Sequence, residues 1–205
     1  MVDGTLTFKS LAPPHYPCST SLAAGQDLHV IPHLGWANAL PGAQVSGSIT
    51  VAGHTFNFNN DLGYHDQNWG DYPFVELVQS WYWGHFSLGP YVATVFDGIA
   101  TDGLEHAIGY AAKNGVELVS DCGVGSSTIR PIGATWPAHA GDPAATALSI
   151  TLPLGNGQTL YANATYVGYD ENDPGIYTRG LVNLTGYVGT TSYTGIGMFE
   201  QFRLS

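Results

Sequence analysis

From about residue 44 onward, apolar and polar residues alternate in short runs separated by turn signals. Alternation with a period of two is the pattern of a strand that buries one face. Asp-Gly or Asn-Gly pairs stand between apolar runs at residues 102–103, 114–115 and 156–157, and such pairs fit tight hairpin turns because they tolerate positive φ. The predicted strands are Gln44–Val51, Thr55–Asn59, Val75–Phe86, Pro90–Ala100, Glu105–Ala112, Val116–Cys122, Ser127–Pro131, Ala147–Leu154, Thr159–Tyr166, Ile176–Val188 and Thr194–Leu204.

The turn signals recur about every 8–12 residues, which is the spacing of an antiparallel β-sandwich or barrel. No segment combines a helical period with a capping residue, although Asp71–Leu77 leaves room for a short helix. We therefore expect an all-β fold, an antiparallel barrel or sandwich of about ten strands with little helix.

The N-terminal part of the chain lacks this regular pattern. Several prolines with scattered Gly and Ser lie between residues 11 and 43, and they oppose a regular element. A structureless run of about 30 residues is unusual inside a compact domain. We therefore predict that residues 1–43 form an irregular N-terminal or interdomain segment and that residues 44–205 form the β domain. Residues 132–146 are predicted to be a second long loop.

Composition and charge narrow the possible functions. The chain has 205 residues, of which 44% are hydrophobic, enough for one sizeable core. Its formal net charge is −11, and Lys and Arg together number only 5. Because phosphate groups are bound by clustered cations, this excludes nucleic acid and anionic membrane surfaces as expected partners. An apolar run of about 18 residues is also missing, so no membrane span is expected.

The compartment stays open between cytoplasm and secretion. No secretory signal is visible at the N-terminus, yet glycosylation triplets occur at residues 163–165 and 183–185. Cys18 and Cys122 could form one disulfide, but the sequence does not give the distance between them.

Candidate chemistry is concentrated in Gly63–Gly70 and in Trp81–His85. Dense aromatic side chains can enclose an apolar cavity with a few fixed polar groups, which is the usual composition of a small-molecule site. Adjacent strand residues face opposite sides, so His65 and Asp66 both face inward only if the flanking glycines introduce a bulge or bend. A neighbouring carboxylate would then let His65 act as an acid or a base. The alternative is that these side chains cap backbone groups at the bend.

Alternation places Trp81, Trp83 and His85 on one strand face. They form either a pocket wall or part of a plain hydrophobic core. Asp97 is either a strand-end residue or an inward carboxylate with a perturbed pKa. Arg179, opposite Glu200 on the last two strands, is consistent with a structural salt bridge.

Metal and cofactor motifs are weak or missing. The 8 histidines are dispersed, and the sequence contains no Cys-x-x-Cys, His-Glu-x-x-His or Gly-x-Ser-x-Gly pattern. A phosphate-cradling glycine loop is missing as well. We therefore expect no metal site and no cofactor.

With these residues in view, the chain resembles the carotenoid hydratase-like group, which includes fungal kievitone hydratase-like proteins and fungal Diels–Alderases. The resemblance covers about residues 11–204. It implies two packed lipocalin-like β domains with an apolar ligand near their interface, this chain being the C-terminal one. The N-terminal lipocalin-like domain would then be a partner in the same or another chain. The matching elements are Ala12–Cys18, Gly63–Gly70, Ser80–His85, Gly89–Tyr91 and Gly195–Phe202.

The resemblance implies three functions, which differ in their proton chemistry. Carotenoid hydratases commonly have a histidine where this chain has Gln67, and an amide cannot protonate an alkene. This favours a cofactor-independent Diels–Alderase-type cyclase acting on an apolar polyene or isoprenoid intermediate, for which a shaped pocket is the main requirement. The alternatives are a hydratase of a flavonoid- or terpenoid-like alkene and a non-catalytic carrier of an apolar metabolite. The predicted catalytic residues are His65, Asp66, Gln67, Asn68 and Asp97, and the predicted substrate-binding residues are Tyr64, Trp69, Trp81, Trp83, His85 and Glu200.

Overall fold

The computed structural model describes residues 1–19, 21–173 and 175–205, and within them it contains thirteen strands and one short helix. The predicted all-β antiparallel fold is confirmed. In the same residues, no helix is both long and apolar enough to cross a membrane. The elements are β1 (Val2–Ser10), β2 (His29–Ile31), β3 (Leu34–Val51), β4 (His54–Gly70), α1 (Phe74–Leu77), β5 (Val78–Leu88), β6 (Tyr91–Ala100), β7 (Glu105–Lys113), β8 (Val116–Cys122), β9 (Thr128–Ile132), β10 (Ala147–Pro153), β11 (Thr159–Asp173), β12 (Tyr177–Val188) and β13 (Thr191–Arg203).

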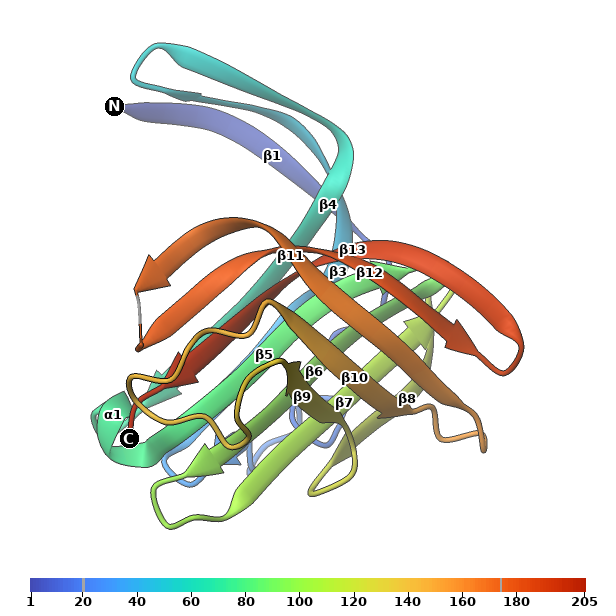
Figure 1. Ribbon diagram of the computed structural model, residues 1–205. Coiled ribbons are helices and arrows are strands. Elements are labelled where there is room, and N and C mark those ends of the chain that lie inside the picture. Colours follow the sequence, from blue (N-terminus) through green and yellow to red (C-terminus); the bar gives the residue numbers. More distant parts are fainter. Residues whose placement is uncertain (20, 174) are drawn as a thin grey trace.

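Nine strands form one curled antiparallel sheet in the order β8-β7-β6-β5-β13-β12-β11-β10-β9 (Figure 1). The sheet closes on itself because Ile129 of β9 donates its backbone N–H to the carboxylate of Asp97 on β6. The Asp-Gly and Asn-Gly pairs make three of the hairpin turns, between β6 and β7, β7 and β8, and β10 and β11. The structure is therefore a lipocalin-like barrel.

Side chains fill the interior of this barrel. They come from β5, β6 and β10 to β13, and most are almost completely buried. Native cores reach the packing density of organic crystals, so an interior of this kind is a stable core and not a ligand container. Its largest members are Tyr82, Phe86, Tyr91, Leu148 and Phe199.

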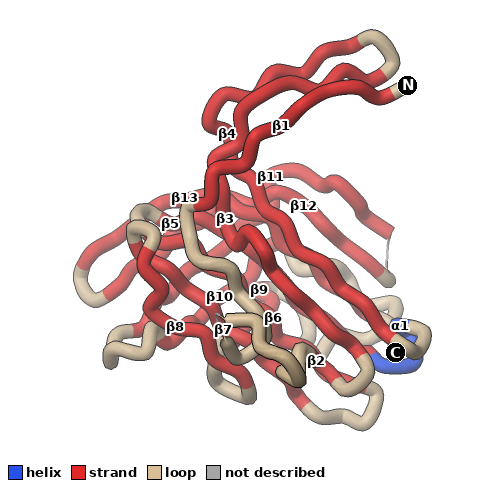
Figure 2. The backbone as a smooth tube through the Cα atoms, turned by 180° about the vertical axis from the view of Figure 1, so that it is seen from behind, coloured by secondary structure: helices blue, strands red, loops and turns tan. Residues whose placement is uncertain are grey.

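The first four strands form a second sheet, in which β3 pairs with β1, β2 and β4. The open end of the β3–β4 hairpin, which contains the start of β3 and the end of β4, lies across the outer face of the barrel. There Leu34 and Trp36 pack with side chains of β5 and β6, namely Trp81, Trp83 and Phe96. The far end joins β1 and projects away from the barrel as an arm (Figures 1 and 2). Most of β1 and the first half of β4 are exposed on this arm.

The structure corrects the predicted irregularity of residues 1–43, because β1 and the start of β3 are regular strands. Pro41 is tolerated since the β3–β4 register shifts between Leu40 and Ala43, which leaves the ladder interrupted at that point. Among the described residues of this part, the irregular ones are mainly 11–19 and 21–28. Other boundaries also differ, because β4 continues to Gly70 where a strand only to Asn59 was predicted.

Three further expectations are settled by the structure. A short helix does form, at Phe74–Leu77. Residues 133–146 do lie between strands, as predicted for the second long loop. Cys18 and Cys122 are joined in a disulfide, which ties the irregular segment to the end of β8.

Candidate active site

A pocket of about 300 Å³ lies between β4 and the outer face of β5, β12 and β13. The alternation of β4 brings Tyr64, Asp66 and Asn68 to its inner side, while alternation in β5 supplies Trp81 and Trp83. The hairpin of β12 and β13 contributes the floor, because Arg179 and Glu200 are direct cross-strand partners. We call this the acidic pocket, and its lining residues are Tyr64, Asp66, Asn68, Phe74, Trp81, Trp83, Arg179, Glu200 and Phe202.

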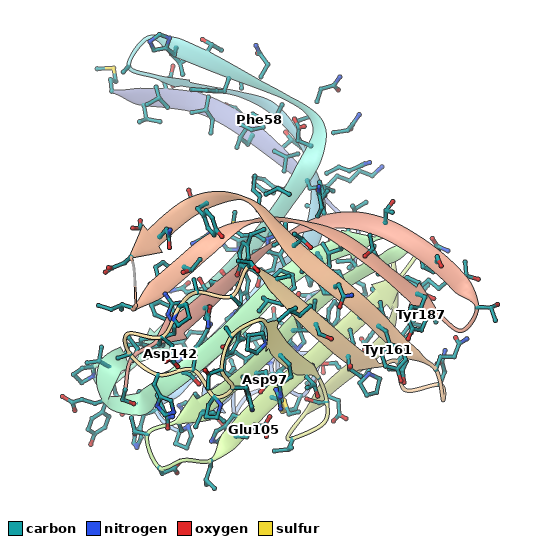
Figure 3. The ribbon with its side chains drawn as sticks, viewed as in Figure 1. Phe58, Asp97, Glu105, Asp142, Tyr161 and Tyr187 are labelled. Atoms are coloured by element: carbon teal, nitrogen blue, oxygen red, sulfur yellow. A yellow bond between two sulfur atoms is a disulfide. The ribbon has the colours of Figure 1, made fainter. Side chains whose placement is uncertain are left out.

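A second pocket, of about 500 Å³, continues from the first along the same face of the barrel. Tyr64 and Arg179 line both pockets, so together they form one groove. One wall of the second pocket is the base of the arm, whose Phe58 is labelled above the barrel in Figure 3. Most of the remaining lining is aliphatic, and we call it the apolar pocket. Its apolar side chains include Leu6, Phe8, Val45, Phe58, Leu62, Val167, Leu181, Ile196 and Met198.

Each carboxyl group of the acidic pocket is held by one indole and one phenol. Asp66 Oδ2 accepts hydrogen bonds from Trp36 Nε1 (2.8 Å) and from the Tyr64 hydroxyl (3.0 Å). Glu200 accepts from Trp81 Nε1 at Oε1 (3.0 Å) and from the Tyr177 hydroxyl at Oε2 (2.9 Å). Both carboxyl groups are therefore fixed in orientation, as catalytic groups need to be.

The electrostatics of the pocket make Glu200 a weaker acid than an exposed glutamate. Burial raises the pKa of Glu200, and the neighbouring Asp66 adds to the rise, against the opposing hydrogen bonds and the charge of Arg179. Burial also raises the pKa of Tyr64 well above its ordinary value. Glu200 can therefore donate a proton at a higher pH than an exposed glutamate, while Tyr64 stays a neutral hydrogen-bond donor.

Aromatic rings lie where the two pockets meet. Tyr64 stacks on His85 with ring centroids 4.0 Å apart, and it meets Trp83 edge-on at 5.3 Å. Burial lowers the pKa of His85 to about 3, helped by the charge of Arg179, so His85 is a neutral ring of the wall. In the described part of the chain, the buried Trp83 Nε1 has no hydrogen-bond partner.

The structure brings together seven of the residues expected at the site. Six line the acidic pocket, and His85 lines the apolar pocket. The six are Tyr64, Asp66, Asn68, Trp81, Trp83 and Glu200.

His65, Gln67 and Trp69 lie on the opposite face of β4, where they are exposed. The expectation that a bend turns both His65 and Asp66 inward is therefore wrong. The irregularity lies in β3, which has two residues between Ala37 and Leu40 where β4 has only one between their partners. Since β4 stays regular from Gly63 to Gly70, its alternation is preserved there. The Gln67 side chain consequently faces away from the pocket, and it does not bear on the chemistry there.

Asp97 belongs to the closure of the barrel and lines neither pocket. Its fully buried carboxylate pairs with Arg130 and accepts the N–H of Ile129, while Arg130 also pairs with Glu105. Burial raises the pKa of Asp97 to about 7 against these partners. Figure 3 shows Asp97 and Glu105 together, low in the view and away from Phe58. Of the two alternatives for Asp97, the structure shows the inward carboxylate.

Sequence reasoning missed five residues of the candidate site. Trp36 and Tyr177 hold the carboxyl groups, and Phe74, Arg179 and Phe202 line the acidic pocket. The register of the last hairpin could have identified three of them, because Tyr177 pairs with Phe202 two residues from the pair Arg179–Glu200. The expected salt bridge between Arg179 and Glu200 is replaced by a weaker approach of Arg179 to Asp170, at 3.6 Å.

Comparison with known proteins connects this site to natural-product enzymes. The chain is 34% identical to the quinolone epoxide rearrangement protein asqO of Emericella nidulans, over 98% of this chain and 55% of that protein. It is 32% identical to the quinolone epoxide rearrangement protein penF of Penicillium thymicola, over 98% of this chain and 56% of that protein. The chain thus spans about half the length of these relatives.

Solved structures share the fold at low sequence identity. CghA, in its complex with Sch210972, matches with a TM-score of 0.72 and 15% identity, over 100% of this chain and 62% of that one. Kievitone hydratase from Nectria haematococca matches with a TM-score of 0.63 and 14% identity, over 98% of this chain and 61% of that one. Residues 1–128, which include β4, β5 and β6, match the model of the Diels-Alderase-like family. This protein therefore belongs to the Diels-Alderase-like family.

Proposed function

We propose that this chain carries the active site of a cofactor-independent isomerase of natural-product biosynthesis, which rearranges an epoxide of an apolar, quinolone-like intermediate. One observation carries the proposal. A buried glutamate with a raised pKa, Glu200, is fixed at the wall of an indole-lined pocket. The relatives named for quinolone epoxide rearrangement support the choice of reaction.

The first step is proton transfer from Glu200 to the epoxide oxygen. The C–O bond to the more substituted carbon then breaks, leaving a hydroxyl on one carbon and a cation on its neighbour. A substituent on the hydroxyl-bearing carbon migrates to the cation with its bonding electrons. The resulting protonated carbonyl returns its proton to the Glu200 carboxylate. No atom is gained or lost, so the reaction is an isomerisation without oxidant, reductant or water.

The pocket walls suit the positive charge that develops in this reaction. The faces of indole and phenol rings attract cations by about 0.5–2 kcal/mol each, and more strongly where water is excluded. Trp81, Trp83 and Tyr64 supply such rings around the Glu200 carboxyl group. The Asp66 carboxylate, fixed in orientation by Trp36 and Tyr64, adds a negative charge on the other wall. Preorganised groups of this kind lower the barrier without reorganising during the reaction.

A pericyclic cyclisation is the second candidate, and the match to the Diels-Alderase-like family model favours it. Such a reaction would use the joined pockets mainly as a mould for a folded polyene. It does not need the proton of Glu200, and this separates the two candidates.

An N-terminal lipocalin-like domain, in the same or another chain, is part of the proposal. Apolar side chains around the groove are left open, with Leu181 55% and Ile196 52% exposed. Open apolar patches of this kind are typical of interaction surfaces. The expected result is that turnover by this chain rises when such a domain is supplied together with it, as measured in the assay below.

The test is to incubate the protein with a synthetic quinolone epoxide and to follow the product by mass spectrometry and NMR. An isomer of unchanged mass is expected, whereas gain of one water would indicate hydration and unchanged bound ligand would indicate a carrier. Glu200→Gln should lower kcat by about 10²- to 10⁴-fold, the usual contribution of a general acid. The matched control is Glu117→Gln on β8, which lines neither pocket and should leave kcat unchanged. Full turnover by Glu200→Gln would contradict the acid role and favour the pericyclic candidate.

A further inference from the structure

Arg179 occupies the junction of the two pockets. It projects from the outer face of β12, with Glu200 as its cross-strand partner and Leu181 two residues further along the same face. It lines both the acidic and the apolar pocket. The whole sequence has only 5 Lys and Arg residues, and in the described part of the chain Arg179 is the only one that lines either pocket.

The partners of this guanidinium are poor ones. Within the described residues, Nε donates to the sulfur of Met198 at 3.1 Å, and the Tyr177 hydroxyl lies close enough to the guanidinium to help raise its pKa. A thioether is a weak acceptor, and a guanidinium carries five N–H donors. Asp170 lies 3.6 Å away, but its side chain is 63% exposed, so this pairing is weakened by solvent.

Glu200 does not satisfy the guanidinium either, because its two oxygens accept from Trp81 and Tyr177. Burial alone would lower the pKa of Arg179, but Tyr177, Glu200 and Asp170 outweigh it and raise the pKa. Arg179 is therefore a permanent cation that lines the groove, with more N–H donors than protein acceptors beside it. The Arg179 side chain is 40% exposed, so water solvates the guanidinium in the free protein, and a ligand oxygen would take the place of such a water as acceptor.

We propose that Arg179 is a substrate-binding residue that holds a carbonyl or enolate-type oxygen of the ligand at the junction. This inference rests on the proposed function for the class of ligand, an oxo-substituted aromatic ring system. The terminal nitrogens bind the oxygen and thereby direct the reacting group toward Glu200. Hydrocarbon substituents on the other side of the ring then lie over Leu181, Ile196 and Met198 in the apolar pocket. The groove thus selects ligands that carry the oxygen between a reactive end and an apolar end.

The test compares two probes that differ in this oxygen, 3-hexyl-1-methylquinolin-2-one and 3-hexyl-1-methyl-1,2-dihydroquinoline, in which CH2 replaces the carbonyl group, by isothermal titration calorimetry at neutral pH. The wild-type protein should bind the oxo probe about 10- to 100-fold more tightly, the usual effect of a hydrogen bond to a charged group. Arg179→Gln should reduce this preference to less than about 3-fold, and Arg179→Lys should keep part of it because the charge remains. The matched control, Lys113→Gln, removes a cation outside both pockets and should keep the full preference.

Equal binding of the two probes by the wild type, no binding of the oxo probe, or a full preference in Arg179→Gln would each overturn the inference. Thermal melting of each variant checks that it is folded, and Arg179→Lys serves if Arg179→Gln is not. The proposed function can fail separately. If the oxo preference depends on Arg179 but no epoxide is isomerised, the binding role stands and the isomerase proposal falls. If Arg179→Gln isomerises the epoxide with an unchanged KM, the isomerase proposal stands and the binding role of Arg179 falls.

Discussion

The inner and outer faces of β5 are used in different ways. Tyr82, Phe86 and Leu88 point into the barrel, where they are at most 2% exposed and surrounded by other core side chains. Trp81 and Trp83, on the outer face, are equally protected from solvent but border a pocket. The same strand therefore supplies stability on one side and a binding surface on the other. Because the interior is filled, the candidate ligand site of this barrel is the groove outside it, under β4.

The tight fit of the inner face appears at Gly84. A Cβ atom at this position would lie 2.3 Å from the ring of Phe199 on the neighbouring strand β13, closer than real side chains come. The outer face of β5 is packed less tightly at Trp81 and Trp83, because these rings border the acidic pocket. Substitutions on the two faces should thus affect different measurements.

The largest expected effect on stability is that of an inner-face deletion. Phe199→Ala removes a ring that is 0% exposed and should lower the free energy of unfolding by about 3–5 kcal/mol. Phe202→Ala, on the outer face of the same strand, should cost less, because Phe202 is only partly buried beside the acidic pocket. Urea unfolding measures both. A larger loss for Phe202→Ala would contradict the division between the faces.

The disulfide is expected to have the next largest effect. Cys18→Ser removes a cross-link between residues separated by 104 positions, and loss of a native disulfide typically costs about 2–5 kcal/mol. In thermal unfolding, reductant should destabilise the wild type by the same amount as the substitution does. Reductant should not destabilise the Cys18→Ser variant further. Probe binding at 20 °C should be unchanged, because Cys18 lines neither pocket. Loss of binding in a folded Cys18→Ser protein would show that the segment at 11–28 acts on the groove.

The pH dependence of stability should identify the buried carboxyl group at the barrel closure. Asp97 has an ordinary pKa of 3.8, which burial raises to about 7 in the folded protein. Between these values the folded state binds more protons than the unfolded state, so its stability falls as pH rises through this window. The change should be on the order of a few kcal/mol. Asp97→Asn should flatten this slope in urea unfolding between pH 4 and 7, and an unchanged slope would contradict the assignment.

Much of the fold could be predicted from the sequence, because local signals determine it. Alternating runs and Asn-Gly or Asp-Gly turns predicted the succession of barrel strands along the chain and the positions of three hairpins. The length of β4 could not be predicted in this way. Its polar segment from Asn59 to Gly70 is strand only because β3 pairs with it over the barrel, and pairing partners distant in sequence leave no local signal.

The site was predicted in part for the same reason. Aromatic density correctly located Trp81 and Trp83, since indoles pack wherever a pocket or core exists. The side on which His65 and Asp66 lie depended on which strand of the β3–β4 pair carries the bulge, and the glycines beside them favoured the wrong one. Arg179 and Tyr177 were missed as site residues because their role arises from the register of β12 with β13.

The smallest expected effect separates the two faces of β4. His65→Ala removes an exposed side chain and should change the free energy of unfolding by no more than about 0.5 kcal/mol. Isomerisation and probe binding should also be unchanged, since His65 lines neither pocket. The matched variant is Asn68→Ala, three residues along on the pocket face, which should weaken probe binding with similarly little loss of stability. A strong loss of turnover in His65→Ala alone would mean that this imidazole reaches the substrate after all, through a rearrangement of β4 or through a surface that another domain completes.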